Sequence, residues 1–208
     1  LKEESFTHDL QYNDGVAMLH RLKAFAKEHN VSFGVKLSNT LPVKITQGEL
    51  PGEEMYMSGR SLYPLTINLA YKLAAEFNGD LKISYSGGAD AFNVSQIFAT
   101  GIRPITVATT ILKPGGYYRL KQMVEILEPE LDNLESDRID LDKLKALAES
   151  SVSDVNHHKE KRKVKSRKIN QKLPLLDCFK APCTIGCPIG QDIPEYIRLV
   201  NEGRYNEA

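Results

Sequence analysis

Hydrophobic residues recur at helical spacing in several stretches of the chain. Residues 9–29 predict an amphipathic helix, because apolar residues return every three or four positions between Lys, Arg and Glu. The apolar positions of this stretch are Leu10, Val16, Leu19, Leu22, Phe25 and Ala26. The same periodicity predicts helices over residues 62–77 and 115–127, and a shorter helix over 92–100 with Asn93 as its cap.

Mostly apolar runs alternate with these helices. Residues 31–37 lack a clear polar alternation, which is typical of a parallel strand covered on both faces. Residues 81–88 predict a strand that leads into a glycine turn, and residues 103–112 predict another buried strand that ends near Lys113. Strands that alternate with helices through short turns predict βα units, and therefore an α/β fold with a parallel sheet. Three strands are too few for a closed barrel, so we expect further strands upstream of Leu1 and a chain that is a piece of a longer one.

Composition and charge restrict the partners. The 208 residues are 41% hydrophobic and 26% charged, which is ordinary for a globular protein. Because 27 Lys and Arg balance 27 Asp and Glu, no net charge favours nucleic acid or an anionic membrane. No apolar run approaches the roughly 18 residues that span a bilayer, and the first residues lack a signal peptide. We therefore expect a cytoplasmic protein with neither nucleic-acid nor membrane partners.

Blocks of like charge follow the last predicted βα unit. Residues 125–142 are rich in Glu and Asp, and residues 157–168 in Lys and Arg. A solvated helical connector explains both blocks, and a docking surface for an acidic partner is the alternative. The resulting division is a barrel portion over 1–128, a charged helical linker over 129–170, and the start of another domain over 171–208.

Three cysteines supply the main chemical signal. Cys178, Cys183 and Cys187 are spaced as C-x4-C-x3-C-P, and no other cysteine occurs. Closely spaced thiolates bind iron–sulfur clusters, with zinc or unligated thiols as the alternatives. His157 and His158 could supply a nitrogen ligand, but they adjoin a basic run and are expected to face water. We expect the missing ligands downstream of Ala208.

The cysteine string resembles the iron–sulfur domain of the glutamate synthase small subunit and of dihydropyrimidine dehydrogenase. That pattern is C-x2-C-x4-C-x3-C-P followed by D-I-P, which here is Asp192 to Pro194. Leu175 stands where the first cysteine of the pattern would fall. The resemblance implies a helical domain with [4Fe-4S] clusters, of which one ligand is absent or replaced.

The glycines after the second predicted strand could cradle a phosphate or simply form a tight turn. The string from Ser86 to Leu112 resembles the last two βα units of flavin-binding (β/α)8 barrels of the dihydroorotate and dihydropyrimidine dehydrogenase type. By that resemblance, FMN-binding candidates are Lys36, Asn39, Thr40, Ser58, Gly59, Gly87, Gly88, Ala108 and Thr109. No catalytic Cys or Ser can be located in this portion.

The order of barrel and cysteine domain, with strings such as YSGGADAFNV and DCFKAPC, resembles the selenate reductase iron-sulfur subunit family. The resemblance implies an oxidoreductase subunit that relays electrons from NAD(P)H through FAD and the clusters. FAD and NAD(P)H would bind in downstream domains, and other subunits or domains would be partners. Alternatives are a flavin-free barrel that serves as a docking scaffold, and an FMN-dependent pyrimidine-type reductase. Selenate is only a label here, because no residue recognises it.

Overall fold

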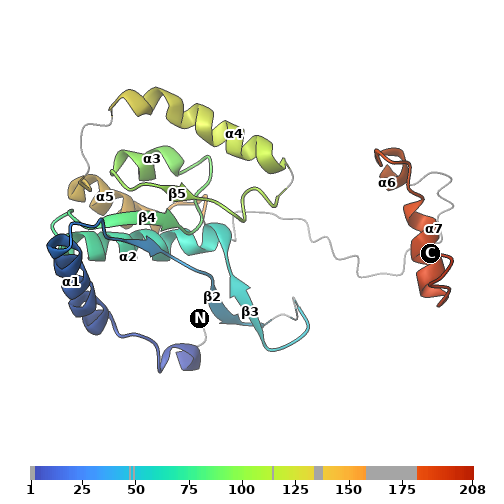
Figure 1. Cartoon of the computed structure of the whole chain (residues 1–208), viewed down its shortest axis with the longest axis horizontal. Coiled ribbons are helices and arrows are strands. Elements are labelled where there is room, and N and C mark those ends of the chain that lie inside the picture. The colour runs from blue at the N-terminus through green and yellow to red at the C-terminus, as the bar shows by residue number, and fades with distance from the viewer. Residues whose placement is uncertain (1–2, 47, 49, 114, 134–137, 158–181) are drawn as a thin grey trace. The chain divides into compact units, whose positions relative to one another are not determined.

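The computed structural model describes residues 3–46, 48, 50–113, 115–133, 138–157 and 182–208 (Figure 1). The chain divides into two compact units, Leu1–Lys163 and Val164–Ala208.

The first unit is built on a parallel sheet. Its strands lie in the order β1-β4-β5, with Val35 paired to Ile83 and Tyr85 paired to Ile105. The strands of this sheet are β1 (Gly34–Leu37), β4 (Lys82–Ser86) and β5 (Ile105–Thr106). Helix α1 (Tyr12–Glu28) precedes β1, helices α2 (Tyr63–Glu76) and α3 (Val94–Ala99) separate the three strands along the chain, and α4 (Gly116–Leu127) follows β5. The predicted α/β fold with parallel βα units is confirmed.

Short elements depart from the predicted pattern. Strands β2 (Leu41–Lys44) and β3 (Glu54–Met57) form an antiparallel hairpin that the Pro- and Gly-punctuated sequence did not predict. Strand β5 has only two residues, because the chain beyond Thr106 leaves the sheet to line a pocket. Strand β1 is not covered on both faces, since Lys36 is exposed. Short 3-10 turns occupy η1 (Glu3–Phe6), η2 (Gly59–Leu62) and η3 (Glu128–Asn133).

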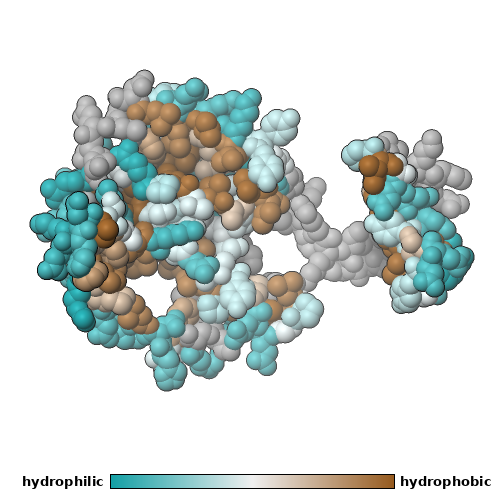
Figure 2. Space-filling model, viewed as in Figure 1, coloured by the Kyte–Doolittle hydropathy of each residue, from teal (hydrophilic) through white to brown (hydrophobic). Residues whose placement is uncertain are grey.

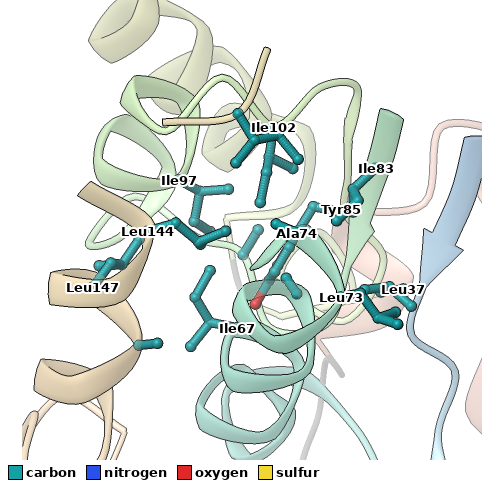
Figure 3. Close-up of a cluster of buried hydrophobic side chains, with 14 of the residues drawn as sticks. Leu37, Ile67, Leu73, Ala74, Ile83, Tyr85, Ile97, Ile102, Leu144 and Leu147 are labelled. Carbon is teal, nitrogen blue, oxygen red and sulfur yellow. The ribbon is translucent and has the colours of Figure 1, made fainter. Parts of the chain in front are cut away.

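Helix α2 lies at the centre of the hydrophobic core. Ile67, Ala70 and Ala74 are fully buried on it and belong to one hydrophobic cluster with Ile83 and Tyr85 of β4. Figure 3 shows part of this cluster. A helix that is apolar on most of its surface has to be covered on several sides. In α2 the covering layers are the sheet and helix α5.

Helix α5 (Leu141–Ser151) belongs to this core. Leu144 points from α5 toward the cluster around Ile67 (Figure 3) and is fully buried, and Leu147 is a further buried residue of this helix. Asn68 of α2 donates to the carbonyl oxygen of Ala148 at 3.2 Å, which ties the two helices together. The first unit therefore continues past residue 128, where the sequence predicts its end. The charged residues of α5 are exposed on its outer face, and its apolar residues pack against α2.

The second unit contains α6 (Pro182–Ile185) and α7 (Ile193–Asn201). The Asp192 side chain accepts a hydrogen bond from the backbone N–H of Glu195 at 3.3 Å and so caps α7.

The surface is mixed in polarity. Figure 2 shows hydrophobic side chains gathered over α3 and α4 in this view. Val124 of α4 is an exposed hydrophobic residue. Among the described residues, no helix combines the length and the hydropathy that crossing a membrane would require.

Candidate functional site

A pocket of about 150 Å³ lies at the carboxyl ends of the three parallel strands. Its walls are the loops that follow β1, β4 and β5, together with the loop between β3 and α2. Most of the residues predicted from the sequence line this pocket: Asn39, Thr40, Ser58, Gly59, Gly87, Gly88, Ala108 and Thr109. Segments that are distant in the sequence meet here because parallel strands present their carboxyl ends at one edge of the sheet.

Lys36 does not line the pocket. It pairs with Ser84 in the middle of the ladder between β1 and β4, and its side chain is exposed. The predicted flavin-contacting lysine therefore lies apart from the other candidates. Because β1 ends at Leu37, only residues beyond it reach the pocket edge.

The turn formed by Gly87 and Gly88 is held from its inner side. The Tyr85 hydroxyl donates to the Gly87 carbonyl oxygen at 2.9 Å, and the Asn93 amide donates to the Gly88 carbonyl oxygen at 3.1 Å. In a trans peptide the carbonyl and the following N–H point in opposite directions. The N–H groups of Gly88 and Ala89 therefore point away from these side chains, as anion-binding turns require.

Asn93 is central to this arrangement. It is almost completely buried, and its side-chain oxygen accepts a hydrogen bond from the backbone N–H of Asp90 at 2.8 Å. The sequence predicts that Asn93 caps the following helix. It does occupy the N-cap position of α3, but its side chain bonds the glycine turn instead of the helix.

The tyrosine that bonds this turn is buried beside a second buried tyrosine, Tyr63. Burial, followed by the nearby Tyr63, raises the pKa of Tyr85 well above its usual value. Burial also raises the pKa of Tyr63, with smaller contributions from Asp154 and Asp90. Both hydroxyls therefore stay protonated, and Tyr85 can act as the donor to Gly87.

Glycine is required where the loops of the pocket touch. Gly88 has φ +78°, and a Cβ atom there would lie 2.5 Å from the Gly59 carbonyl oxygen. A Cβ atom on Gly59 would lie 2.9 Å from the Thr109 side chain, and one on Gly87 would lie 2.3 Å from the Thr66 hydroxyl oxygen. The loops thus pack too closely for side chains at these three positions.

An ion pair that the sequence did not predict lines the pocket. Arg60 Nε pairs with Asp90, whose side chain is only 3% exposed. The Arg60 guanidinium also lies over the Phe92 ring at 4.7 Å, and the Phe92 N–H donates to Asp90 at 2.9 Å. Their positions in the sequence could have identified them, because Arg60 directly follows Gly59 and Asp90 comes two residues after Gly88. Lys113 is a second cationic residue of the lining.

Hydroxyl groups complete the lining. The Ser38 and Thr66 hydroxyls lie 2.7 Å apart behind the glycine turn. Of these two residues, Ser38 lines the pocket. The other hydroxyl-bearing residues of the lining are Thr40, Ser58, Ser86, Thr106, Thr109 and Thr110. Backbone N–H groups, hydroxyls and a guanidinium are the donors that bind phosphate or another oxyanion.

His157 does not face water, contrary to our expectation. Its side chain is fully buried, its ring centroid lies 4.2 Å from that of Tyr63, and Nε2 lies 3.4 Å from a carboxylate oxygen of Asp154. The contact with the Tyr63 ring accounts for this burial, which the adjoining basic sequence does not indicate. His158 lies outside the described residues.

Two of the three cysteines belong to the described part of the chain. Cys183 is exposed on α6, and the Cys187 sulfur accepts a hydrogen bond from the Gln191 N–H at 3.3 Å. The N–H groups of Gln191, Ile189 and Gly190 lower the pKa of Cys187, which favours the thiolate. Cys178 lies outside the described residues, and within them no three His, Cys, Asp or Glu side chains gather to hold a metal.

Comparison with known proteins identifies a family whose members this chain resembles. Residues 1–159 match the family described as oxidoreductase YgfK, N-terminal TIM-barrel domain. The whole chain is 50% identical to "Putative oxidoreductase YgfK" of Escherichia coli strain K12, and equally to that of strain O157:H7. The chain spans about a fifth (20%) of the length of these relatives. No solved structure matches the chain.

Proposed function

The chain belongs to the family of oxidoreductase YgfK N-terminal TIM-barrel domains, and on that premise we propose that its first unit holds the phosphate end of FMN. The position of the pocket carries the proposal. TIM-barrel enzymes place their active sites at the carboxyl ends of the strands, and they bind phosphate at the loops of the last strands. The pocket lies at that end of β1, β4 and β5.

The donors of the pocket fit a phosphate group. The N–H groups of Gly88 and Ala89 point away from the side chains that hold the turn, and hydroxyls and the Arg60 guanidinium lie on the same lining. An oxyanion at this position would meet donors on several sides, which is how nests and loop amides bind phosphate. Ser58, Thr109 and the glycine turn would hold and orient the group.

The size of the pocket supports a phosphate end rather than a complete flavin. Its volume is about 150 Å³, whereas pockets for drug-sized ligands measure about 300–1,000 Å³. The isoalloxazine ring would therefore lie beyond this cavity. When bound, FMN would supply reversible electron transfer, and the residues of this pocket would anchor its phosphate end.

We further propose that the cysteine segment holds an iron–sulfur cluster in a multi-cofactor oxidoreductase subunit. The observation that favours it is the hydrogen bond that the Gln191 backbone N–H donates to the Cys187 sulfur at 3.3 Å. Cluster ligands are thiolates, and hydrogen bonds to sulfur tune cluster potentials. Cys178, Cys183 and Cys187 would be ligands. Electrons would pass from NAD(P)H through FAD to the clusters, with FAD and NAD(P)H bound elsewhere in the longer protein.

The test of the flavin proposal is the flavin content of the full-length protein that contains this chain. Acid-released flavins are separated by chromatography after anaerobic purification. About one FMN per chain beside FAD supports the proposal. FAD without FMN contradicts it and favours a barrel that serves as a docking scaffold. Turnover of uracil-like substrates by an FMN-containing protein would instead identify a pyrimidine-type reductase.

The test of the cluster proposal is the content of iron and acid-labile sulfide in the same protein. Cys183→Ser should lower both, whereas the adjacent substitution Thr184→Ser should leave both unchanged. Zinc without labile sulfide in the unmodified protein would contradict the proposal and make the cysteine segment structural.

A further inference from the structure

We propose that Arg60 is the residue that makes the pocket selective for a phosphorylated flavin, and that Asp90 and Phe92 position it. This inference rests on the proposed function, because it names the charged group that recognises the phosphate in that same site. It starts from the contacts of one guanidinium group.

The first contact fixes the orientation of Arg60. Its Nε pairs with a carboxylate oxygen of Asp90, and the other oxygen of Asp90 accepts the backbone N–H of Phe92 at 2.9 Å. Asp90 is only 2% exposed, so its carboxylate depends on these partners for compensation. The guanidinium is therefore paired with a buried carboxylate whose position is also fixed by the Phe92 N–H.

The second contact fixes the plane of the guanidinium. Its carbon lies 4.7 Å from the centroid of the Phe92 ring, close enough for a cation–π interaction. The Arg60 side chain keeps 19% of its surface exposed. A group held at Nε and stacked on one face can still offer its two Nη atoms to a ligand.

The third observation is location. Arg60 follows Gly59, and Asp90 follows Ala89, and all four residues line the pocket. The ion pair therefore bridges the loop before α2 and the loop after β4 beside the amides that would hold the phosphate. A guanidinium fork binds two phosphate oxygens at once, which a lysine ammonium cannot do.

The same arrangement explains selectivity. Asp90 neutralises the charge of Arg60, so the pair has no net charge that would attract anions in general. Riboflavin lacks the phosphate and gains nothing from the Nη atoms, whereas FMN gains charge-assisted hydrogen bonds. The preference for FMN over riboflavin should therefore depend on Arg60.

The experiment is equilibrium dialysis of the flavin-stripped, full-length protein against FMN and against riboflavin. We expect the unmodified protein to prefer FMN and Arg60→Gln to lower that preference at least about tenfold, since hydrogen bonds to charged groups are among the strongest in proteins. Arg60→Lys should retain only part of the preference. Arg103→Gln is the matched control, because Arg103 also stacks on an aromatic ring, that of Phe98 at 5.7 Å, but does not line the pocket.

Arg60→Gln leaves the buried Asp90 carboxylate without its cation and could prevent folding. The double variant Arg60→Gln/Asp90→Asn removes both charges and leaves no buried carboxylate without its cation, so it should fold and show the same loss of preference. Undiminished preference in this double variant overturns the role of Arg60 while the proposed function stands. An unmodified protein that binds FMN no better than riboflavin overturns the proposed function itself.

Discussion

The carbonyl oxygen of Gly59 lies 2.5 Å from the point that a Cβ atom on Gly88 would occupy. Gly59 precedes α2, and Gly88 follows β4, so this approach joins two loops that come from different βα units. Gly88 also has φ +78°, a conformation that residues with a side chain rarely adopt. The wall of the pocket thus depends on the absence of two side chains.

Gly88→Ala should lower the free energy of unfolding by more than the about 1–2 kcal/mol that a left-handed conformation alone costs. The excess arises because the new methyl group meets the Gly59 carbonyl. Gly48→Ala is the control, since Gly48 has φ +64° and a Cβ atom added there would meet no neighbouring atom within 4 Å. Urea unfolding measures both variants, and equal losses would show that the close approach has no energetic weight.

Asn93→Ala should destabilise the first unit by about 2–4 kcal/mol, because it leaves the Gly88 carbonyl and the Asp90 N–H without their buried partner. Asn93→Asp keeps the acceptor, but it loses the donor and adds a charge beside Asp90, so it should cost at least as much. Gln96→Ala, on the exposed face of α3, is the control and should change stability little. Thermal unfolding monitored by circular dichroism distinguishes these outcomes, and a loss no larger than that of the control would contradict the role of Asn93.

Leu144→Ala should lower the free energy of unfolding by about 2–5 kcal/mol, as a cavity in a well-packed core does. Leu144 is fully buried against α2, whereas Val152 at the end of the same helix is 63% exposed. Val152→Ala is therefore the control and should cost well under about 1 kcal/mol. Similar losses in the two variants would contradict the assignment of α5 to the core of the first unit.

Asp140 caps α5, and its pKa is lowered chiefly by the hydrogen bond from the Lys143 N–H. A carboxyl group whose pKa is lower in the folded state stabilises it above the unfolded pKa, and this contribution is lost as the pH falls through the folded pKa. Asp140→Asn retains a capping oxygen without the charge. Its stability deficit at neutral pH should therefore shrink below about pH 4, which urea unfolding at several pH values would measure. A deficit that does not change with pH would contradict this linkage.

Lys36→Met should leave the affinity for FMN unchanged within about twofold, a difference below about 0.5 kcal/mol, because the Lys36 side chain does not line the pocket. Asn39→Ala, on the loop that does line it, should weaken binding in the same dialysis experiment. A large loss with Lys36→Met would restore the role that the family resemblance implies for this lysine.

Much of the fold could be predicted from local pattern. Apolar periodicity located α1, α2 and α4, and apolar runs located β1 and β4, because burial on one or two faces leaves a direct trace in the sequence. The hairpin of β2 and β3 left no such trace, since its residues are only partly buried. The sequence pattern places α5 in a linker, because the charged face of this helix dominates its composition.

The candidate site divides in the same way. Glycines and hydroxyl residues that follow strands could be identified in sequence, because a strand end determines where they lie. The pair of Arg60 and Asp90 could not, since it requires the approach of two loops from separate βα units. The burial of His157 likewise depends on Tyr63, a residue far from it along the chain.

A glycine turn that offers main-chain donors has an evolutionary consequence. Main-chain donors are present whatever side chains the surrounding positions carry, so much of the lining can change without loss of binding. Divergence among relatives should therefore be high around the pocket except at the glycines, at the residues that fix their carbonyls, at Asn39 and at the pair of Arg60 and Asp90. The presence of Gly59, Gly88 and Asn93 in a distant sequence would be a better guide to a shared ligand than overall identity.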